Sequence, residues 1–422
     1  MKLFNPPQGQ PVERPGLILF ALWLLIFSAS SQIIIIAPIL PVIGIQLNMP
    51  EALQGVLVTS YAVMVGIFAL IIGPISDKIG RRRVLLIGTL SMAIALSLHG
   101  LAQTWQQLLF MRALAGVAGG LLSGSAVSYV GDYFPVERRG WATGWIMSGA
   151  ATGQIVGIPL GTVMAEFFGF RIPFLMFGLT MFATWFLVAR YVPQPPVRLN
   201  RMPITVSGSI RAYVQLLKRP KILAATGSFF LMFISVGLFI VYFPTWLQHS
   251  FDVNGTYIAS LFLVGGVANV ILGPRAGALS DKIGRKALVM ISCLITSLVF
   301  AATTFAIVAP WIGYPFIFIV MSLVAMRVSP FQALLTELVT DEKRGSLLSL
   351  NAALGQAGLG LGGAVAGVLY TIQGYASNTI LSGITILVTG LIIWRYVPES
   401  AHFRKQKVLQ RQKLRKDSIL GE

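Results

Sequence analysis

Charged residues are scarce in this chain of 422 residues, at 11% of the sequence, against about a quarter in an average soluble domain. Hydrophobic residues make up 55%. A soluble domain with so little charge would lack side chains to cover its surface, whereas a membrane protein needs polar residues only in its loops. The composition therefore predicts an integral membrane protein.

Cysteine and histidine are nearly absent. The single cysteine, Cys293, excludes an internal disulfide and a cysteine-based metal site. The three histidines are scattered along the chain, so we expect no metal centre. The chain has no Gly-x-x-x-x-Gly-Lys-Ser/Thr loop, which argues against an ATPase. It also shows no Ser-His-Asp or paired-carboxylate arrangement, so we expect neither enzymatic activity nor a cofactor.

Long stretches of the chain contain no Asp, Glu, Lys or Arg. A membrane helix needs about 20 mostly apolar residues, and most of these stretches have about that length. The stretches 287–326 and 345–394 are twice as long, and each has a turn signal near its middle. Polar and apolar residues do not alternate within these stretches, as they would in the strands of an outer-membrane barrel, and this argues against a barrel. We therefore predict an all-α polytopic membrane protein with transmembrane helices near residues 18–42, 53–75, 84–103, 107–130, 141–164, 172–191, 222–247, 256–276, 287–308, 314–336, 346–371 and 377–397.

The net charge is +18, and its distribution is one-sided. In the predicted topology, 29 of the 32 Lys and Arg lie in the termini, in the even-numbered loops or at the helix ends beside them. By the positive-inside rule, both termini lie in the cytoplasm. No base-reading chemistry accompanies the charge, so we expect no nucleic-acid partner. We expect a multi-pass protein of the plasma membrane, in bacteria the inner membrane, that works as a monomer in the lipid bilayer.

One charged loop occurs twice, as GPISDKIGRRR at 73–83 and as GALSDKIGRK at 277–286. The segment DYFPVERRG at 132–140 also matches ELVTDEKRG at 337–345. Because the two offsets nearly agree, the halves of the chain read as a duplicated six-helix unit, a recurrent transporter design. The predicted organisation is an N-terminal tail (1–16), a six-helix bundle (17–191), a cytoplasmic linker (192–221), a second bundle (222–397) and a basic tail (398–422).

The duplicated loop resembles the signature of the major facilitator superfamily, Gly-x-x-x-Asp-Arg/Lys-x-Gly-Arg-Arg/Lys. This resemblance covers about residues 15–400 and implies two six-helix bundles that work by alternating access. It implies that Asp77 and Asp281 face helix starts near Gly345 and Gly140 when the cytoplasmic side is closed. Glycine at the first motif position permits close helix approach, and glycine before the arginine permits a tight turn. The implied gating residues are Gly73, Asp77, Gly80, Arg81, Arg82, Gly277, Asp281, Gly284 and Arg285.

Two further segments resemble the drug–proton antiporter branch of that superfamily. LLFMRALAGVAGG places Arg112 in the fourth predicted helix, in an Arg-x-x-x-Gly pattern. GAATGQIVGIPLG in the fifth helix resembles the antiporter segment, although its proline comes later than in the family pattern. The alternative for this segment is a packing seam of small residues, formed by Gly149, Gly153, Gly157, Pro159 and Gly161. The resemblance implies an exporter of small organic molecules that exchanges them for protons.

No acidic residue lies inside a predicted span, although proton antiporters usually need a protonatable carboxylate in the membrane. Asp132, which closes the fourth helix, is the best remaining candidate for proton coupling. The spans do contain two arginines, Arg112 and Arg327, and a charge in the membrane is a functional hypothesis by default. Other candidates for substrate contact or coupling are polar and uncharged: Gln32, Gln154, Asn269, Gln332, Asn351 and Gln356.

Three functions remain open from the sequence. The first is the small-molecule exporter. The second is an organic-anion carrier, a uniporter or symporter, in which Arg327 binds the substrate. The third is a receptor or scaffold that transports nothing, although a static protein would not need duplicated gating loops.

Overall fold

The computed structural model describes residues 14–196 and 206–399. Within these ranges all regular structure is helical, and twelve segments are long and apolar enough to cross a membrane. This confirms the predicted all-α polytopic fold. The predicted terminal tails, residues 1–16 and 398–422, lie mainly outside the described residues.

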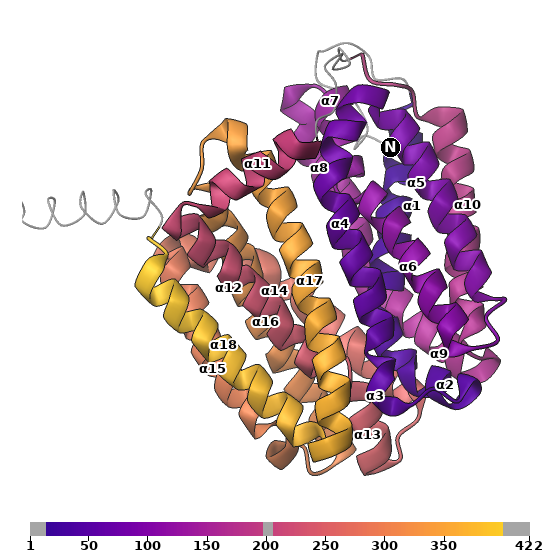
Figure 1. Cartoon of the computed structure of the whole chain (residues 1–422), viewed down its shortest axis with the longest axis vertical. Helices are drawn as coiled ribbons and strands as arrows, with labels where there is room; N and C mark the ends of the chain where they lie inside the picture. The colour runs from indigo at the N-terminus through magenta and orange to yellow at the C-terminus, as the bar shows by residue number, and fades with distance from the viewer. Residues whose placement is uncertain (1–13, 197–205, 400–422) are drawn as a thin grey trace, which may run out of the picture.

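The helices form two bundles that stand side by side (Figure 1). The first half of the chain, α1 to α10, builds one bundle, and α12 to α18 build the other. The helix α11 (Val206–Leu217) connects them at one end of the molecule, within the segment that the sequence indicates as a linker. We call the end with α11 and the Gly80 and Gly284 turns the basic face, and the other end the opposite face.

Two of the expected spans are broken near a proline, whereas the apolar pattern predicts continuous helices there. The first span divides into α1 (Pro15–Ile34) and α2 (Ile36–Leu47), and the seventh into α12 (Pro220–Ile240) and α13 (Phe243–Phe251). A proline has no N–H to bond the carbonyl four residues earlier. Pro38 and Pro244 therefore leave the carbonyls of the residues that end α1 and α12 without that bond.

Two further expected spans are interrupted by other means. The fourth divides into α6 (Trp105–Leu122) and α7 (Ser125–Tyr133), because Gly124 takes a φ of 70°, which only glycine adopts readily. The fifth contains a π-helical turn, Gly153–Gly157, between α8 (Val136–Thr152) and α9 (Ile158–Phe168). Pro159 follows this turn and removes the hydrogen bond to the carbonyl at position 155.

The remaining described helices follow the predicted spans closely. They are α3 (Glu51–Gln54), α4 (Val56–Ile79), α5 (Arg81–His99), α10 (Arg171–Tyr191), α14 (Gly255–Ile283), α15 (Arg285–Ala306), α16 (Gly313–Thr336), α17 (Asp341–Gln373) and α18 (Tyr375–Tyr396), with a 3-10 turn, Pro310–Ile312, before α16. The bundles meet along two seams, where α4 packs on α17 and where α9 with the π-helical turn packs on α14.

Candidate functional site

The seam between α4 and α17 is tight toward the opposite face. A Cβ atom added at Gly55 would overlap the backbone of Gly363, and Thr59 donates a hydrogen bond to the carbonyl of Gly360 at 2.6 Å. The Tyr242 hydroxyl, also from the second bundle, donates to the backbone carbonyl of Glu51 at 2.6 Å. At these residues the contact between α4 and α17 leaves no space for a water molecule.

The second seam is closed at the same face by a carboxylate. Glu166, near the end of α9, accepts hydrogen bonds from the Gly255 backbone N–H at 3.1 Å and from the Thr256 hydroxyl at 2.7 Å. These donors belong to the first turn of α14, where unpaired N–H groups and the helix dipole favour a negative charge. One bundle therefore caps a helix of the other bundle.

The duplicated loops lie at the basic face, where their glycines are not packed against the other bundle. A Cβ atom added at Gly73, Gly277, Gly140 or Gly345 would meet no atom within 4 Å. The expectation that Gly73 and Gly277 mark close helix approaches is therefore wrong for this conformation, because the bundles diverge at this face. The expected tight turns are confirmed, with φ of 95° at Gly80 and 101° at Gly284.

Each loop closes a charge network inside its own bundle. The Arg81 guanidinium lies 2.6 Å from Asp77 and 2.6 Å from Asp132. The aspartates that the family resemblance places against the other bundle are therefore bound within their own loops in this conformation. The second loop repeats the arrangement, with Arg285 at 3.3 Å from Asp281 and 2.6 Å from Glu337.

The next basic residue of each loop holds the end of the last helix in its bundle. Arg82 donates to the carbonyls of Ala189 and Val192 at 2.7 and 2.8 Å. Lys286 donates to the carbonyl of Trp394 at 2.7 Å. Cations are favoured at helix C-termini, so the second arginine of the motif fastens α10 and the matching lysine fastens α18.

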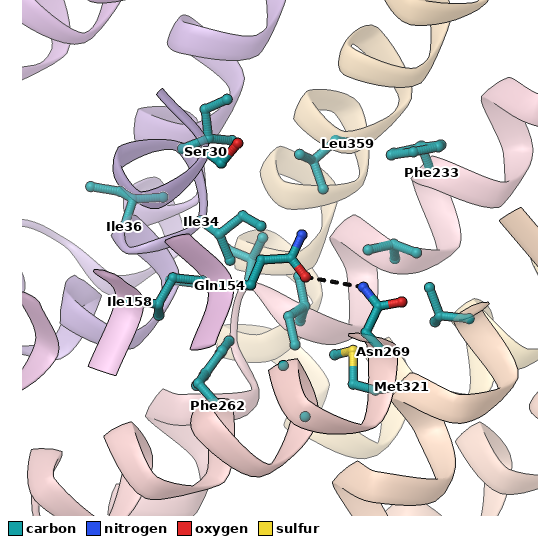
Figure 2. A pocket seen from close by; sticks show the side chains of 18 of the residues that line it. Ser30, Ile34, Ile36, Gln154, Ile158, Phe233, Phe262, Asn269, Met321 and Leu359 are labelled. Carbon is teal, nitrogen blue, oxygen red and sulfur yellow. Dashed lines mark hydrogen bonds between the residues drawn. The ribbon is translucent and has the colours of Figure 1, made fainter. Parts of the chain in front are cut away.

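A cavity of about 390 Å³ lies between the bundles. Helices of both halves line it, as Figure 2 shows for Ile34, Ile158, Phe262 and Leu359. Its walls are mainly aliphatic. Its polar side chains are uncharged, namely Ser30, Gln154, Asn269 and Gln356.

A pair of amides joins the bundles in this cavity. The Asn269 side-chain N–H group donates to the Gln154 side-chain oxygen at 3.0 Å (Figure 2). Gln154 belongs to the π-helical turn, whose backbone also lies against Gly266 of α14. The structure therefore brings together two of the predicted polar residues and places Gln356 in the same cavity.

The glycines of the antiporter-like segment serve packing. A Cβ atom at Gly153 would lie 2.8 Å from the Ser31 hydroxyl oxygen, and one at Gly157 would overlap the same side chain. Similar atoms at Gly149 and Gly161 would overlap α1 or the residue that follows it. This supports the packing-seam interpretation, in which α1 lies directly against α8, the π-helical turn and α9.

Arg112 is fully buried inside the first bundle and does not line the cavity. It donates to the Gln32 side-chain oxygen at 3.3 Å and lies over the Tyr61 ring at 4.5 Å. Gln32 in turn donates to the Tyr61 hydroxyl at 2.8 Å. Gln32, which the sequence suggested as a pore residue, is thus occupied inside the bundle.

Arg327 is also fully buried and faces away from the cavity. Its guanidinium donates to the Thr296 hydroxyl of α15 at 3.0 Å, whereas its neighbours Val324 and Val328 line the cavity. Two of its nitrogens have no hydrogen-bond partner among the described residues. This position does not present the arginine to a substrate in the cavity.

The other predicted residues are dispersed. Gln332 is exposed and lies outside the cavity. Asn351 is buried on α17, and neither polar atom of its amide has a partner within the described part of the chain. The candidate residue that the sequence pattern did not indicate is Glu166, which joins the two bundles. The sequence shows an acidic residue near the end of a predicted helix. It does not indicate that this residue caps the start of α14, which is distant in the sequence.

Comparisons with known proteins agree on one family. The Major Facilitator Superfamily profile matches residues 22–326 and 225–420. The chain is 25% identical over 384 residues to the uncharacterized MFS-type transporter YwfA of Bacillus subtilis, covering 90% of this chain and 92% of that protein. It is 26% identical over 336 residues to the multidrug resistance protein MdtG of Enterobacter lignolyticus, covering 76% and 78%.

A solved structure with a similar fold is that of a D-xylose–proton symporter. The TM-score is 0.75 at 17% sequence identity, over 91% of this chain and 98% of the symporter. At this identity the likeness concerns the fold alone.

Proposed function

The chain belongs to the Major Facilitator Superfamily and is a membrane transporter of that family, and on this basis we propose that it exports small organic molecules from the cytoplasm in exchange for protons. The observation that carries the proposal is the central cavity between the bundles. The contacts of Tyr242 and Glu166 join the bundles at the opposite face, whereas a Cβ atom added at Gly73 or Gly277 of the basic face would meet no atom within 4 Å. We infer the outward direction of transport from the name of the multidrug resistance relatives.

In this proposal the basic face is cytoplasmic, as the distribution of Lys and Arg indicates. The conformation is then inward-facing, with the cavity ready to take a substrate from the cytoplasm. Export requires that the contacts of Glu166 and Tyr242 break and that the duplicated loops come together. The empty space beside Gly73 and Gly277 leaves room for that approach.

Proton coupling requires a carboxylate outside the cavity, because the described lining residues include none. Asp132 remains the candidate. It binds Arg81, which also binds Asp77 of the gating loop. Protonation of Asp132 would release the arginine, and this would link proton binding to the position of the loop.

The test is transport in proteoliposomes with an imposed pH gradient. We expect uptake of a transported compound to follow the gradient in the unmodified protein and to become independent of it in Asp132→Asn. Glu137→Gln, an exposed carboxylate on the same face, is the control and should behave as the unmodified protein. Gradient-driven transport that survives in Asp132→Asn would eliminate Asp132, and transport indifferent to the gradient in the unmodified protein would eliminate proton exchange.

The organic-anion carrier receives no support from the position of Arg327, which lies behind the cavity wall. A role for Arg327 as substrate ligand would require the guanidinium to turn from Thr296 toward the cavity. The exporter is therefore the better supported of the two functions.

A further inference from the structure

The central cavity has a lining that selects by charge. We propose that its substrates are electrically neutral, mainly aliphatic molecules that carry a carbonyl or amide group, and that it excludes organic cations and anions. This inference rests on the proposed transport function and adds the substrate class of the same site.

The first argument is the absence of charge from the cavity wall. None of the described residues that line the cavity is ionisable in the neutral pH range, and the polar ones are a serine, two glutamines and an asparagine. Moving an ion out of water costs several kcal/mol unless an opposite charge or several hydrogen bonds compensate it. This lining offers an ion uncharged hydrogen-bonding groups but no opposite charge, whereas a neutral molecule needs no charge to compensate it.

The second argument is the positive charge buried in the two bundles. Arg112 and Arg327 are both fully buried, one in each bundle. Among the described residues, neither has a carboxylate within salt-bridge distance. In a medium of low dielectric constant their field extends to neighbouring sites, and it opposes a cation. An anion gains little, because Arg327 is not among the lining residues and its guanidinium donates to Thr296 instead.

The third argument is the bonding capacity left by the amide pair. One Gln154–Asn269 hydrogen bond uses one oxygen lone pair and one N–H group. A primary amide has two N–H donors and an oxygen that accepts twice. The pair therefore keeps a donor on Gln154 and an acceptor on Asn269, and the Gln356 side-chain oxygen has no partner among the described residues. A carbonyl or amide group on a substrate matches this set.

Size is compatible with such a ligand, since 390 Å³ lies within the range of about 300–1,000 Å³ for small-molecule sites. The aliphatic side chains that form most of the wall fit a compact hydrocarbon body. Stacking rings are few, because only Phe233 and Phe262 are aromatic among the described lining residues. This favours aliphatic over planar aromatic substrates.

The test uses three compounds with one rigid aliphatic body and different charge: adamantane carboxamide, adamantane methylammonium and adamantane carboxylate. Radiolabelled compounds are measured by equilibrium dialysis against the purified full-length protein, and by flux in proteoliposomes. We expect the carboxamide to bind at least tenfold more tightly than either ion.

Substitutions of Gln154 test whether this side chain sets the preference for a neutral substrate. Gln154→Leu removes a hydrogen bond worth about 0.5–1.5 kcal/mol, so carboxamide binding should weaken by about two- to tenfold. Gln154→Glu introduces the missing negative charge and should raise the affinity for the methylammonium compound above that for the carboxamide. Gln332→Glu, outside the cavity, is the matched control and should leave the preference unchanged.

The outcomes separate this inference from the proposed function. Tighter binding of either ion than of the carboxamide by the unmodified protein, or no binding of any of the three, would overturn the substrate class. Selective binding of the carboxamide without flux would uphold the substrate class and count against export. Flux of an ion alone would uphold transport and overturn the substrate class.

Discussion

Glu166→Gln should open the opposite face of the transporter. The carboxylate of Glu166 is the cap by which the first bundle holds the start of α14, through Gly255 and Thr256. Glutamine keeps the size of the side chain and one oxygen acceptor, but it loses the negative charge and presents an NH2 group to hydrogen-bond donors. The substitution therefore weakens the contact without changing the packing around it.

The expected magnitude follows from the two hydrogen bonds. A hydrogen bond to a charged group contributes about 1.5–3 kcal/mol, and a charge at a helix N-terminus about 0.3–1 kcal/mol when exposed. The Gly255 contact is half-buried and the Thr256 contact is exposed, so solvent screening places the loss near the lower end. A loss of about 1.5 kcal/mol shifts the equilibrium toward the outward-open state about tenfold.

The assay is chemical labelling of a cysteine at Ile158, which lines the cavity. In a cysteine-free background, a membrane-impermeant maleimide applied from the opposite face should react about tenfold faster in Glu166→Gln. Glu137→Gln, an exposed carboxylate at the basic face, should leave the labelling rate unchanged. An unchanged rate in Glu166→Gln, or the same increase in both variants, would refute the assignment of Glu166 to this gate.

Three further predictions test the topology, the loop and the seam. In the same cysteine-free background, cysteines at Asn254 and Lys282 should label from opposite sides of the membrane, and labelling from one side would contradict the twelve-span topology. Asp77→Asn should slow transport in proteoliposomes while the protein stays folded by circular dichroism, because the loop loses its ion pair; an unchanged rate would remove Asp77 from the gate. Gly157→Ala should destabilise the protein by about 1–3 kcal/mol through overpacking against α1. Gly131→Ala is the control and should not destabilise it, because a Cβ atom at that position meets no atom within 4 Å. Equal melting temperatures for the two variants would contradict the packing seam.

Several features of the protein follow from its amino-acid sequence alone. The twelve apolar stretches predict the spans because the bilayer requires about 20 apolar residues in each. The duplicated loop predicts that Arg81 and Arg285 are equivalent, and the structure shows matching charge networks around them. The helix breaks near Pro38 and Pro244 do not follow from the sequence alone, because Pro274 and Pro330 lie inside α14 and α16 without dividing them.

The site itself depended on the tertiary structure. The sequence suggested two arginines and six uncharged polar residues as candidates, without indicating which of them shared a cavity. Gln154 and Asn269 face each other, whereas Gln32 is bound to Arg112 inside a bundle and Arg327 points to Thr296. The direction in which each side chain points is set by the rotation of its helix and by the π-helical turn at Gly153–Gly157.

The contact at Glu166 is the clearest case. Its partners Gly255 and Thr256 are about 90 residues away in the sequence and lie in the other bundle. Local sequence determines that a helix ends near Glu166 and that another begins after Asn254, because caps and turns are local interactions. Which helix start meets which carboxylate is decided by how the two bundles pack, and that depends on the sum of many small side-chain contacts along both seams.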